Sequence, residues 1–259
     1  MIALRRAHAR PREIRPDVLV AVYVAAVVSA EALIVFVNVT AGVLVHAALV
    51  LLLIGRHLLH ESSIPLPFLA IPSLLRLLSL TMPIPELPEL AWYVLVGLPV
   101  LIASLLAVRA ADLRMSDVGL RLQVHRADLI AAAMGLPLGL LASWAYAAPA
   151  AIGATSPMEV LVGSAILVVL VALPEELVFR GMIQRVFVEQ FGGAGVALCA
   201  VLFAAIYLPS LSPALVAVMA AAGLVFGWAA RSSGSLTGAV AGHAILVTSA
   251  WTLWPPVAS

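Results

Sequence analysis

Long apolar stretches alternate with short polar ones along the whole chain. Nine of these stretches are each close to the ~20 residues that a helix needs to cross ~30 Å of hydrocarbon. They cover residues 18–37, 43–59, 64–82, 89–108, 128–148, 158–173, 195–209, 214–230 and 236–254. The pattern predicts an all-α, polytopic membrane bundle of eight or nine transmembrane helices. The number depends on residues 158–190, where a charged motif either ends one long helix or begins a separate lateral one.

Composition agrees with a membrane protein, because 64% of the 259 residues are hydrophobic and only 10% are charged. These values exclude an ordinary soluble domain and a disordered chain. The chain has arginine but no lysine, which together with its many Ala, Val and Leu residues is typical of a GC-rich bacterial gene. The net charge of +1 indicates no nucleic-acid partner. The single cysteine, Cys199, excludes an intrachain disulfide and a cysteine-based metal cluster, so we expect a small buried side chain there.

Arginine placement predicts how the bundle is oriented, because positively charged segments stay in the cytoplasm. Residues 1–16 carry five arginines and no cleavage site, which favours a retained cytoplasmic tail over a signal peptide. The later arginines between spans fall on the same side. The opposite loops contain no arginine; they are residues 38–42, 83–89, 148–157 and 209–213. We therefore expect a multi-pass protein of the cell membrane with a cytoplasmic N-terminus.

The longest polar segment, residues 109–127, is the natural boundary between two halves of the chain. We expect N-terminal transmembrane helices in residues 17–108 and a core in residues 128–259, joined by a solvated, partly helical cytoplasmic connector. Glycine spacings in the second half indicate close helix packing. The glycines concerned are Gly135 with Gly139, Gly223 with Gly227, and the series Gly234, Gly238 and Gly242.

Three formal charges stand together inside the apolar pattern, at Glu175, Glu176 and Arg180. A charged residue at the centre of a membrane helix costs about 2.5–3.5 kcal/mol, so the two acids need a compensating partner. Arg180 lies four residues after Glu176, which places both on one helix face. Glu175 is rotated about 100° away from that face. We therefore expect Glu176 and Arg180 to form a structural pair and Glu175 to face another part of the molecule.

The remaining ionisable residues within the spans have simpler interpretations. Glu31 and Arg76 are expected to neutralise each other between two helices, and His46 is expected to be a core histidine. His243 follows the glycine series, where a neighbouring helix can approach closely. Together with Glu175 it could position a water molecule or polarise a carbonyl group. Zinc bound by two carboxylates and a histidine is a weaker alternative, because the chain has neither HExxH nor a cysteine-rich spacing.

Seven positions follow a three-part pattern, EExxxR, FxxxH and HxxxN, with two departures. The positions are Glu175, Glu176 and Arg180, then Phe203 and Tyr207, then His243 and Val247. Tyr207 stands where the pattern has histidine, and Val247 stands where it has asparagine. Over roughly residues 115–250 the chain thus resembles the CPBP family, also called the Abi or CAAX-protease family, of glutamate-dependent intramembrane endopeptidases.

The resemblance implies hydrolysis of peptide bonds in a membrane-associated peptide or protein. Carried over to this chain, it makes Glu175 the base that activates water, with Glu176 and Arg180 as its support. His243 becomes one oxyanion donor, and Tyr207 takes the place of the histidine that assists the base. Val247 can donate nothing. Losing one oxyanion donor typically lowers the rate by about 10²–10³.

Three interpretations follow from these residues. The first is an endopeptidase that is slow or in which Tyr207 has adapted to the reaction. The second is a catalytically degenerate member of the family that binds a membrane peptide or a partner protein, as a scaffold or an immunity factor. The third is a small transporter or another unrelated polytopic protein. An enzyme requires Glu175 for turnover, whereas a binding protein tolerates its replacement by glutamine.

Overall fold

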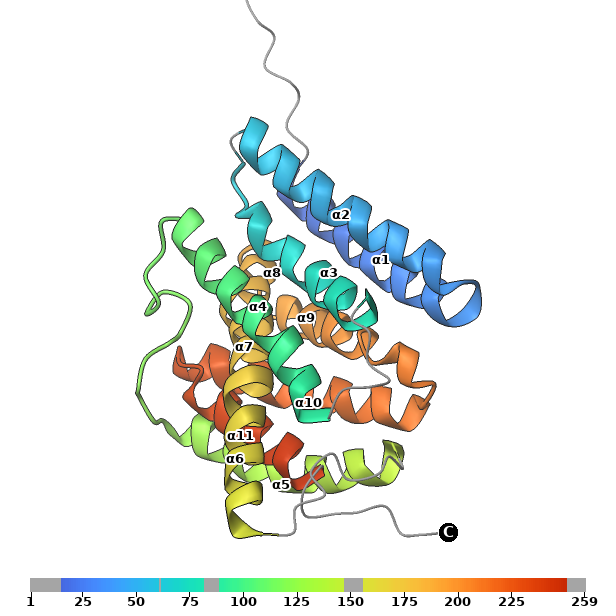
Figure 1. Cartoon of the computed structure of the whole chain (residues 1–259). Coiled ribbons are helices and arrows are strands. Elements are labelled where there is room, and N and C mark those ends of the chain that lie inside the picture. The colour runs from blue at the N-terminus through green and yellow to red at the C-terminus, as the bar shows by residue number, and fades with distance from the viewer. Residues whose placement is uncertain (1–14, 61, 82–88, 147–155, 251–259) are drawn as a thin grey trace, which may run out of the picture.

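Figure 1 shows the computed structural model of the chain, which describes residues 15–60, 62–81, 89–146 and 156–250. All regular structure within these ranges is helical and none is strand, which confirms the predicted all-α fold. The N-terminal helices are α1 (Pro16–Phe36), α2 (Val39–Leu59), α3 (Leu66–Thr81) and α4 (Glu89–Ala110). The C-terminal helices are α5 (Arg126–Tyr146), α9 (Ala194–Ala205), α10 (Pro213–Ser233) and α11 (Thr237–Thr248).

Five consecutive segments between α5 and α9 form one continuous helix. They are α6 (Pro157–Leu167), the π-helical η1 (Val168–Ala172), α7 (Leu173–Glu176), the π-helical η2 (Leu177–Ile183) and α8 (Gln184–Phe191). The charged motif therefore lies in the middle of a long helix, which decides between the two alternatives left by the sequence. Counting this helix once, the described residues contain nine helices, in line with the eight or nine predicted. Six of them are long and apolar enough to cross a membrane.

The long helix is the central element of the bundle. In Figure 1 the α1–α2 hairpin lies at one edge of the molecule and α5 at the opposite edge, with the long helix crossing between them. Its short central segment α7 contacts α4 and α11, and the following η2 contacts α3, α9 and α10. The wider π-helical turns lie directly before and after α7, and such turns are frequent at functional sites. The motif therefore sits where helices from both halves of the chain meet.

Glycines let α11 approach its neighbours to backbone contact. A side chain added at Gly135 on α5 would meet the backbone of Gly242 and, at 2.9 Å, the Cβ atom of Ile245 on α11. Gly238 and Gly242 in turn face the α5 backbone at Asp128 and Ala131. The prediction of close packing is thus confirmed for these positions. The Gly139, Gly223 and Gly227 positions are similarly crowded, by Leu246, Ala200 and Gln184 respectively.

Gly234 has a different role from the packing role that the glycine spacing indicated. It caps the C-terminus of α10 in the left-handed conformation, with φ of 66°, and a side chain added there would meet no atom within 4 Å. The packing prediction is therefore wrong at this position. A positive φ favours glycine because other residues meet steric strain there.

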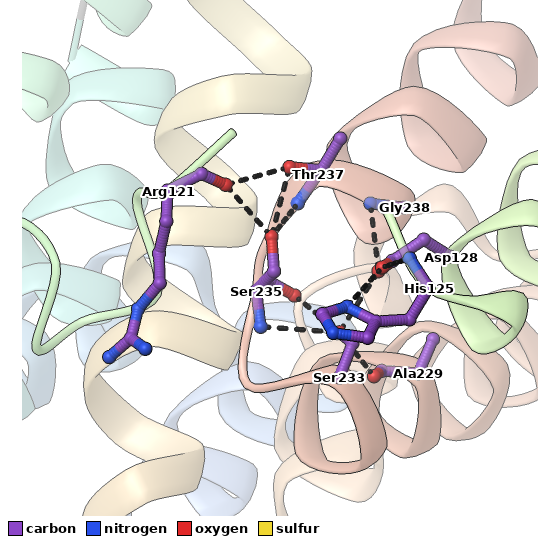
Figure 2. A network of polar contacts seen from close by, with 8 residues as sticks. All are labelled: Arg121, His125, Asp128, Ala229, Ser233, Ser235, Thr237 and Gly238. Atoms are coloured by element: carbon purple, nitrogen blue, oxygen red, sulfur yellow. Dashed lines mark hydrogen bonds and ion pairs between the residues drawn. The ribbon is translucent and has the colours of Figure 1, made fainter. Parts of the chain in front are cut away.

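The connector is folded onto the start of α11 (Figure 2). The Arg121 carbonyl accepts hydrogen bonds from the hydroxyls of Ser235 and Thr237, each at 2.9 Å. Asp128, in the first turn of α5, accepts from Ser233 Oγ at 2.9 Å and from the Gly238 amide at 3.2 Å. Residues 111–125 form turns and irregular structure, so the connector is helical only at its two ends, where it belongs to α4 and α5. These contacts fix the position of the helix that carries His243.

The glycine contacts predict a contrast between two glycine-to-alanine changes in thermal unfolding of the detergent-solubilised protein. Gly135→Ala should destabilise the protein by about 1–3 kcal/mol, because the new methyl group must push α5 and α11 apart. Gly55→Ala in α2 should leave it unchanged or more stable by up to about 1 kcal/mol, since no atom lies within 4 Å of the added methyl group. Equal melting temperatures for the two variants would contradict the packing described here.

The cytoplasmic N-terminus stays a prediction, and two exposed leucines give a direct test. In a Cys199→Ser background, Leu122→Cys lies in the connector and Leu211→Cys between α9 and α10; these leucines are 100% and 74% exposed. A membrane-impermeant thiol reagent applied to intact cells should label only the cysteine at position 211. The cysteine at position 122 should react after permeabilisation. The reverse pattern would overturn the orientation that the arginines predict.

Candidate active site

Glu176 and Arg180 form the ion pair that their spacing predicts. Arg180 Nη1 lies 2.9 Å from Glu176 Oε1, and the two side chains are only 1% and 0% exposed. The guanidinium group also lies over the ring of Phe203, 4.2 Å from its centroid. This second contact brings α9 against the long helix. A buried charge in this position is thus balanced by an opposite charge and by an aromatic face.

His243 joins the same carboxylate from the other side. Its Nδ1 atom lies 2.8 Å from Glu176 Oε1, so one oxygen atom contacts both Arg180 and His243. The imidazole stacks on Phe226 with a centroid distance of 6.0 Å and meets the edge of Phe203 at 5.9 Å. The contact between Glu176 and His243 was not predicted, because no spacing pattern relates residues 67 positions apart.

Glu175 stays outside this pair, as predicted, and faces a cavity of about 580 Å³. Its Oε2 atom lies 3.8 Å from Nε2 of His243. The Tyr207 side chain lies beside the Glu175 carboxylate in the cavity wall. Tyr207 and Val247, the two departures from the family pattern, also line the cavity. Most of the remaining described wall is apolar; it includes Pro72, Leu75, Trp92, Val171, Leu215, Met219 and Leu246.

Two of the buried polar atoms beside the cavity lack a hydrogen-bond partner in the protein. They are Glu175 Oε2 and His243 Nε2, the atoms that lie 3.8 Å apart. A separation of this size is too long for a good direct hydrogen bond but suits one small polar group that bonds to both. The cluster therefore presents an acid and an imidazole to the same point. This is an arrangement that can move protons.

A second buried polar cluster lies in the N-terminal helices. Arg76 Nε on α3 lies 2.8 Å from Glu31 Oε1 on α1, which confirms the expected pair between these helices. His46 is fully buried and bonds through Nδ1 to Ser73 Oγ at 3.1 Å, as expected of a core histidine. The Arg76 side chain also lines the cavity, and its Nη2 donates to the Ile206 carbonyl. No sequence pattern predicts this last contact.

The weaker metal hypothesis has no ligand set in the part of the chain that the structure describes. No group of three or more His, Cys, Asp or Glu side chains is arranged there to hold an ion. Glu176 Oε1 is already engaged by Arg180 and by His243 Nδ1. Cys199, the single cysteine, is buried and donates from Sγ to the Phe179 carbonyl at 3.1 Å. Its expected role as a small buried side chain agrees with this position.

The separate roles of the two glutamates predict that loss of the Glu176 partner destabilises the protein while a change at Glu175 does not. Arg180→Ala should destabilise the protein by about 3–5 kcal/mol, because it leaves the buried Glu176 carboxylate without its cationic partner. Arg180→Met, which keeps most of the side-chain volume, should be destabilised nearly as much if the charge is the cause. Glu175→Gln should melt close to the unmodified protein. Similar losses for Arg180→Met and Glu175→Gln would show that the roles are assigned wrongly.

One of the comparisons with known proteins gives a match. Residues 157–249 match the family model described as type II CAAX prenyl endopeptidase Rce1-like. No curated protein and no solved structure matches the chain. The matched segment begins with the long helix and ends just after α11, so it contains every position of the three-part pattern and none of α1 to α5. This segment of the chain is therefore similar to the Rce1-like endopeptidases.

Proposed function

We propose that this protein is a membrane-embedded endopeptidase in which Glu175 activates water for attack on a peptide bond. The observation that carries the proposal is the pair of unpartnered atoms, Glu175 Oε2 and His243 Nε2, which lie 3.8 Å apart beside the cavity. The family match over residues 157–249 supports peptide hydrolysis in general. A largely apolar cavity inside a helix bundle suits a membrane-associated peptide or protein as substrate.

Glu176 orients the imidazole ring for this role. An ionised carboxylate only accepts hydrogen bonds, so Nδ1 of His243 is the donor in the 2.8 Å contact with Glu176. The opposite nitrogen, Nε2, is then the one that lies toward Glu175. When the ring carries both protons, Nε2 is a donor, and the two carboxylates, the guanidinium and the ring together have no net charge. Such a balance favours burial of the cluster.

In the proposed reaction, Glu175 takes a proton from water while the water oxygen bonds to the carbonyl carbon of the substrate. The negative charge that forms on the carbonyl oxygen is stabilised by the Tyr207 hydroxyl and by Nε2–H of His243. The carbon–nitrogen bond then breaks, and Glu175 transfers the proton to the leaving nitrogen. The products are a new carboxyl group and a free amine. Glu175 returns to its ionised form.

The two departures from the family pattern set the expected rate. Tyr207 can donate a hydrogen bond to an oxyanion or hold water, but it is a poor substitute for imidazole as a proton acceptor near neutral pH. Val247 has no polar atom in its side chain and cannot donate. Each donor that is missing lowers the rate by about 10²–10³. We therefore expect slow cleavage by the unmodified protein.

A second function, binding without cleavage, is favoured by Val247 at the cavity wall. A degenerate family member of this kind would hold a membrane peptide or a partner protein in the same cavity, as a scaffold or an immunity factor. Binding depends on the cavity and its apolar lining, so it would survive Glu175→Gln. Cleavage would not survive this change, which makes the glutamine variant the matched control for every assay.

The decisive measurement is cleavage of a membrane-proximal peptide library by purified protein. We expect slow cleavage by the unmodified protein and none by Glu175→Gln. Tyr207→Phe should be slower still, because it removes the hydroxyl while keeping the ring. The double variant Tyr207→His with Val247→Asn should be faster than the unmodified protein by about 10²–10⁴, since it adds a proton acceptor and a second donor.

The outcomes separate the two functions. Activity only in the double variant, lost again with Glu175→Gln, would identify the natural protein as a binding protein with an intact site. Activity in the unmodified protein that falls in Tyr207→Phe would show that Tyr207 takes part in the reaction. If no folded variant cleaved any peptide of the library, the protease proposal would be excluded.

A further inference from the structure

Arg76 is the one cation among the described residues that line the cavity. It lies on α3, outside residues 157–249, so the family match assigns it no role. Its side chain is 11% exposed. An arginine at the wall of a cavity in the apolar interior of a membrane protein is costly, and it is retained where it has partners and a task. Its direct partners lie on α1, on α3 itself and at the end of α9.

The first set of partners holds the guanidinium in place. Glu31 on α1 is fully buried and lies 2.8 Å from Arg76 Nε. His46 on α2 places Nε2 3.5 Å from the same Glu31 oxygen, and its Nδ1 bonds to Ser73 on α3. On the other edge, Arg76 Nη1 donates to Ser79 Oγ at 3.4 Å. Three helices thus fix the base of this side chain, as a buried and connected polar network does.

The second partner lies at the end of α9. Arg76 Nη2 donates to the carbonyl of Ile206, the residue that caps the C-terminus of this helix. The last carbonyls of a helix have no partner within it, and the negative end of the helix dipole favours a cation there. The next residue is Tyr207, whose ring packs edge-on against Phe203 with a centroid distance of 5.6 Å. Tyr207 lies beside Glu175 in the wall of the cavity.

We propose that Arg76 is a positioning residue, which fixes the end of α9 so that the Tyr207 hydroxyl is held against Glu175. The proposal rests on the endopeptidase function given above and adds a residue from the N-terminal helices to it. The chain of contacts runs from Glu31 through Arg76 to the Ile206 carbonyl, then through one peptide bond to Tyr207. The N-terminal helices thereby control the placement of Tyr207, which stands where the family pattern has histidine.

The alternative is that Arg76 only neutralises Glu31. The geometry distinguishes the two roles, because the planar guanidinium contacts Glu31 through Nε and Ile206 through Nη2. Lysine can pair with Glu31 but lacks this fork, so it cannot serve both partners in the same way. Arg76→Lys therefore keeps the positive charge beside Glu31 and removes the simultaneous hydrogen bond to the Ile206 carbonyl. Folding should tolerate it, since no buried carboxylate is left unpaired.

The experiment reports on Tyr207 directly. The chain has four tyrosines, so protein labelled with fluorotyrosine gives four ¹⁹F resonances, and the one lost in Tyr207→Phe belongs to Tyr207. We expect that resonance to move or split in Arg76→Lys and in the charge-free double variant Glu31→Gln with Arg76→Met. It should stay in place in Arg231→Met, a control at an exposed arginine near the end of α10. In cleavage assays kcat should fall by about 10–100-fold in both Arg76 variants while KM changes little.

An unchanged Tyr207 resonance in both Arg76 variants, with the folded state confirmed by thermal unfolding, would overturn the proposal and leave Arg76 as a partner of Glu31 only. A rise in KM without a change in kcat or in the resonance would also overturn the proposal, because it would place Arg76 in substrate binding. A moved resonance supports the positioning role even where no variant and not even the unmodified protein cleaves a peptide. In that case the endopeptidase proposal fails by itself.

Discussion

The buried carboxylate of Glu176 is the constraint on which the site depends. Its Oε1 atom contacts Arg180 at 2.9 Å from within the same helix and His243 at 2.8 Å from α11. An unpaired charge at this depth would cost several kcal/mol, so α11 has to stay within hydrogen-bonding distance of the long helix. On another side, the glycines of α11 pack against the backbone of α5. Charge balance with the long helix and close packing against α5 therefore both fix the position of α11.

The two contacts of Glu176 show what the sequence could and could not predict. The spans and the contact between Glu176 and Arg180 follow from local periodicity, because both depend on residues a few positions apart in one helix. The contact between Glu176 and His243 joins residues 67 positions apart, and the bond from Arg76 to Ile206 joins residues 130 apart. No periodicity carries such information. Spacing also misled at Gly234. Its position matched the series of packing glycines, but in the structure it caps the C-terminus of α10.

Two parts of the molecule outside the family-matched segment hold that segment in shape. The connector binds the start of α11 through the Arg121 carbonyl, and Asp128 on α5 bonds the first turn of the same helix. At the opposite end of the site, Arg76 bonds the last carbonyl of α9. One contact set controls the helix that carries His243, and the other controls the helix that leads to Tyr207. The residues of the three-part pattern are thus supported by residues outside it.

The charge cluster and the cavity wall have separate physical requirements. His243 is held by Glu176 and by the rings of Phe203 and Phe226, and none of these contacts involves position 207 or 247. Replacing histidine by tyrosine and asparagine by valine therefore leaves the buried charges balanced and the helices in place. Tyr207 and Val247 instead line the cavity. The cluster therefore maintains the fold of the site, and under the proposed function the wall residues, together with Glu175, would determine whether the protein hydrolyses a peptide or only binds it.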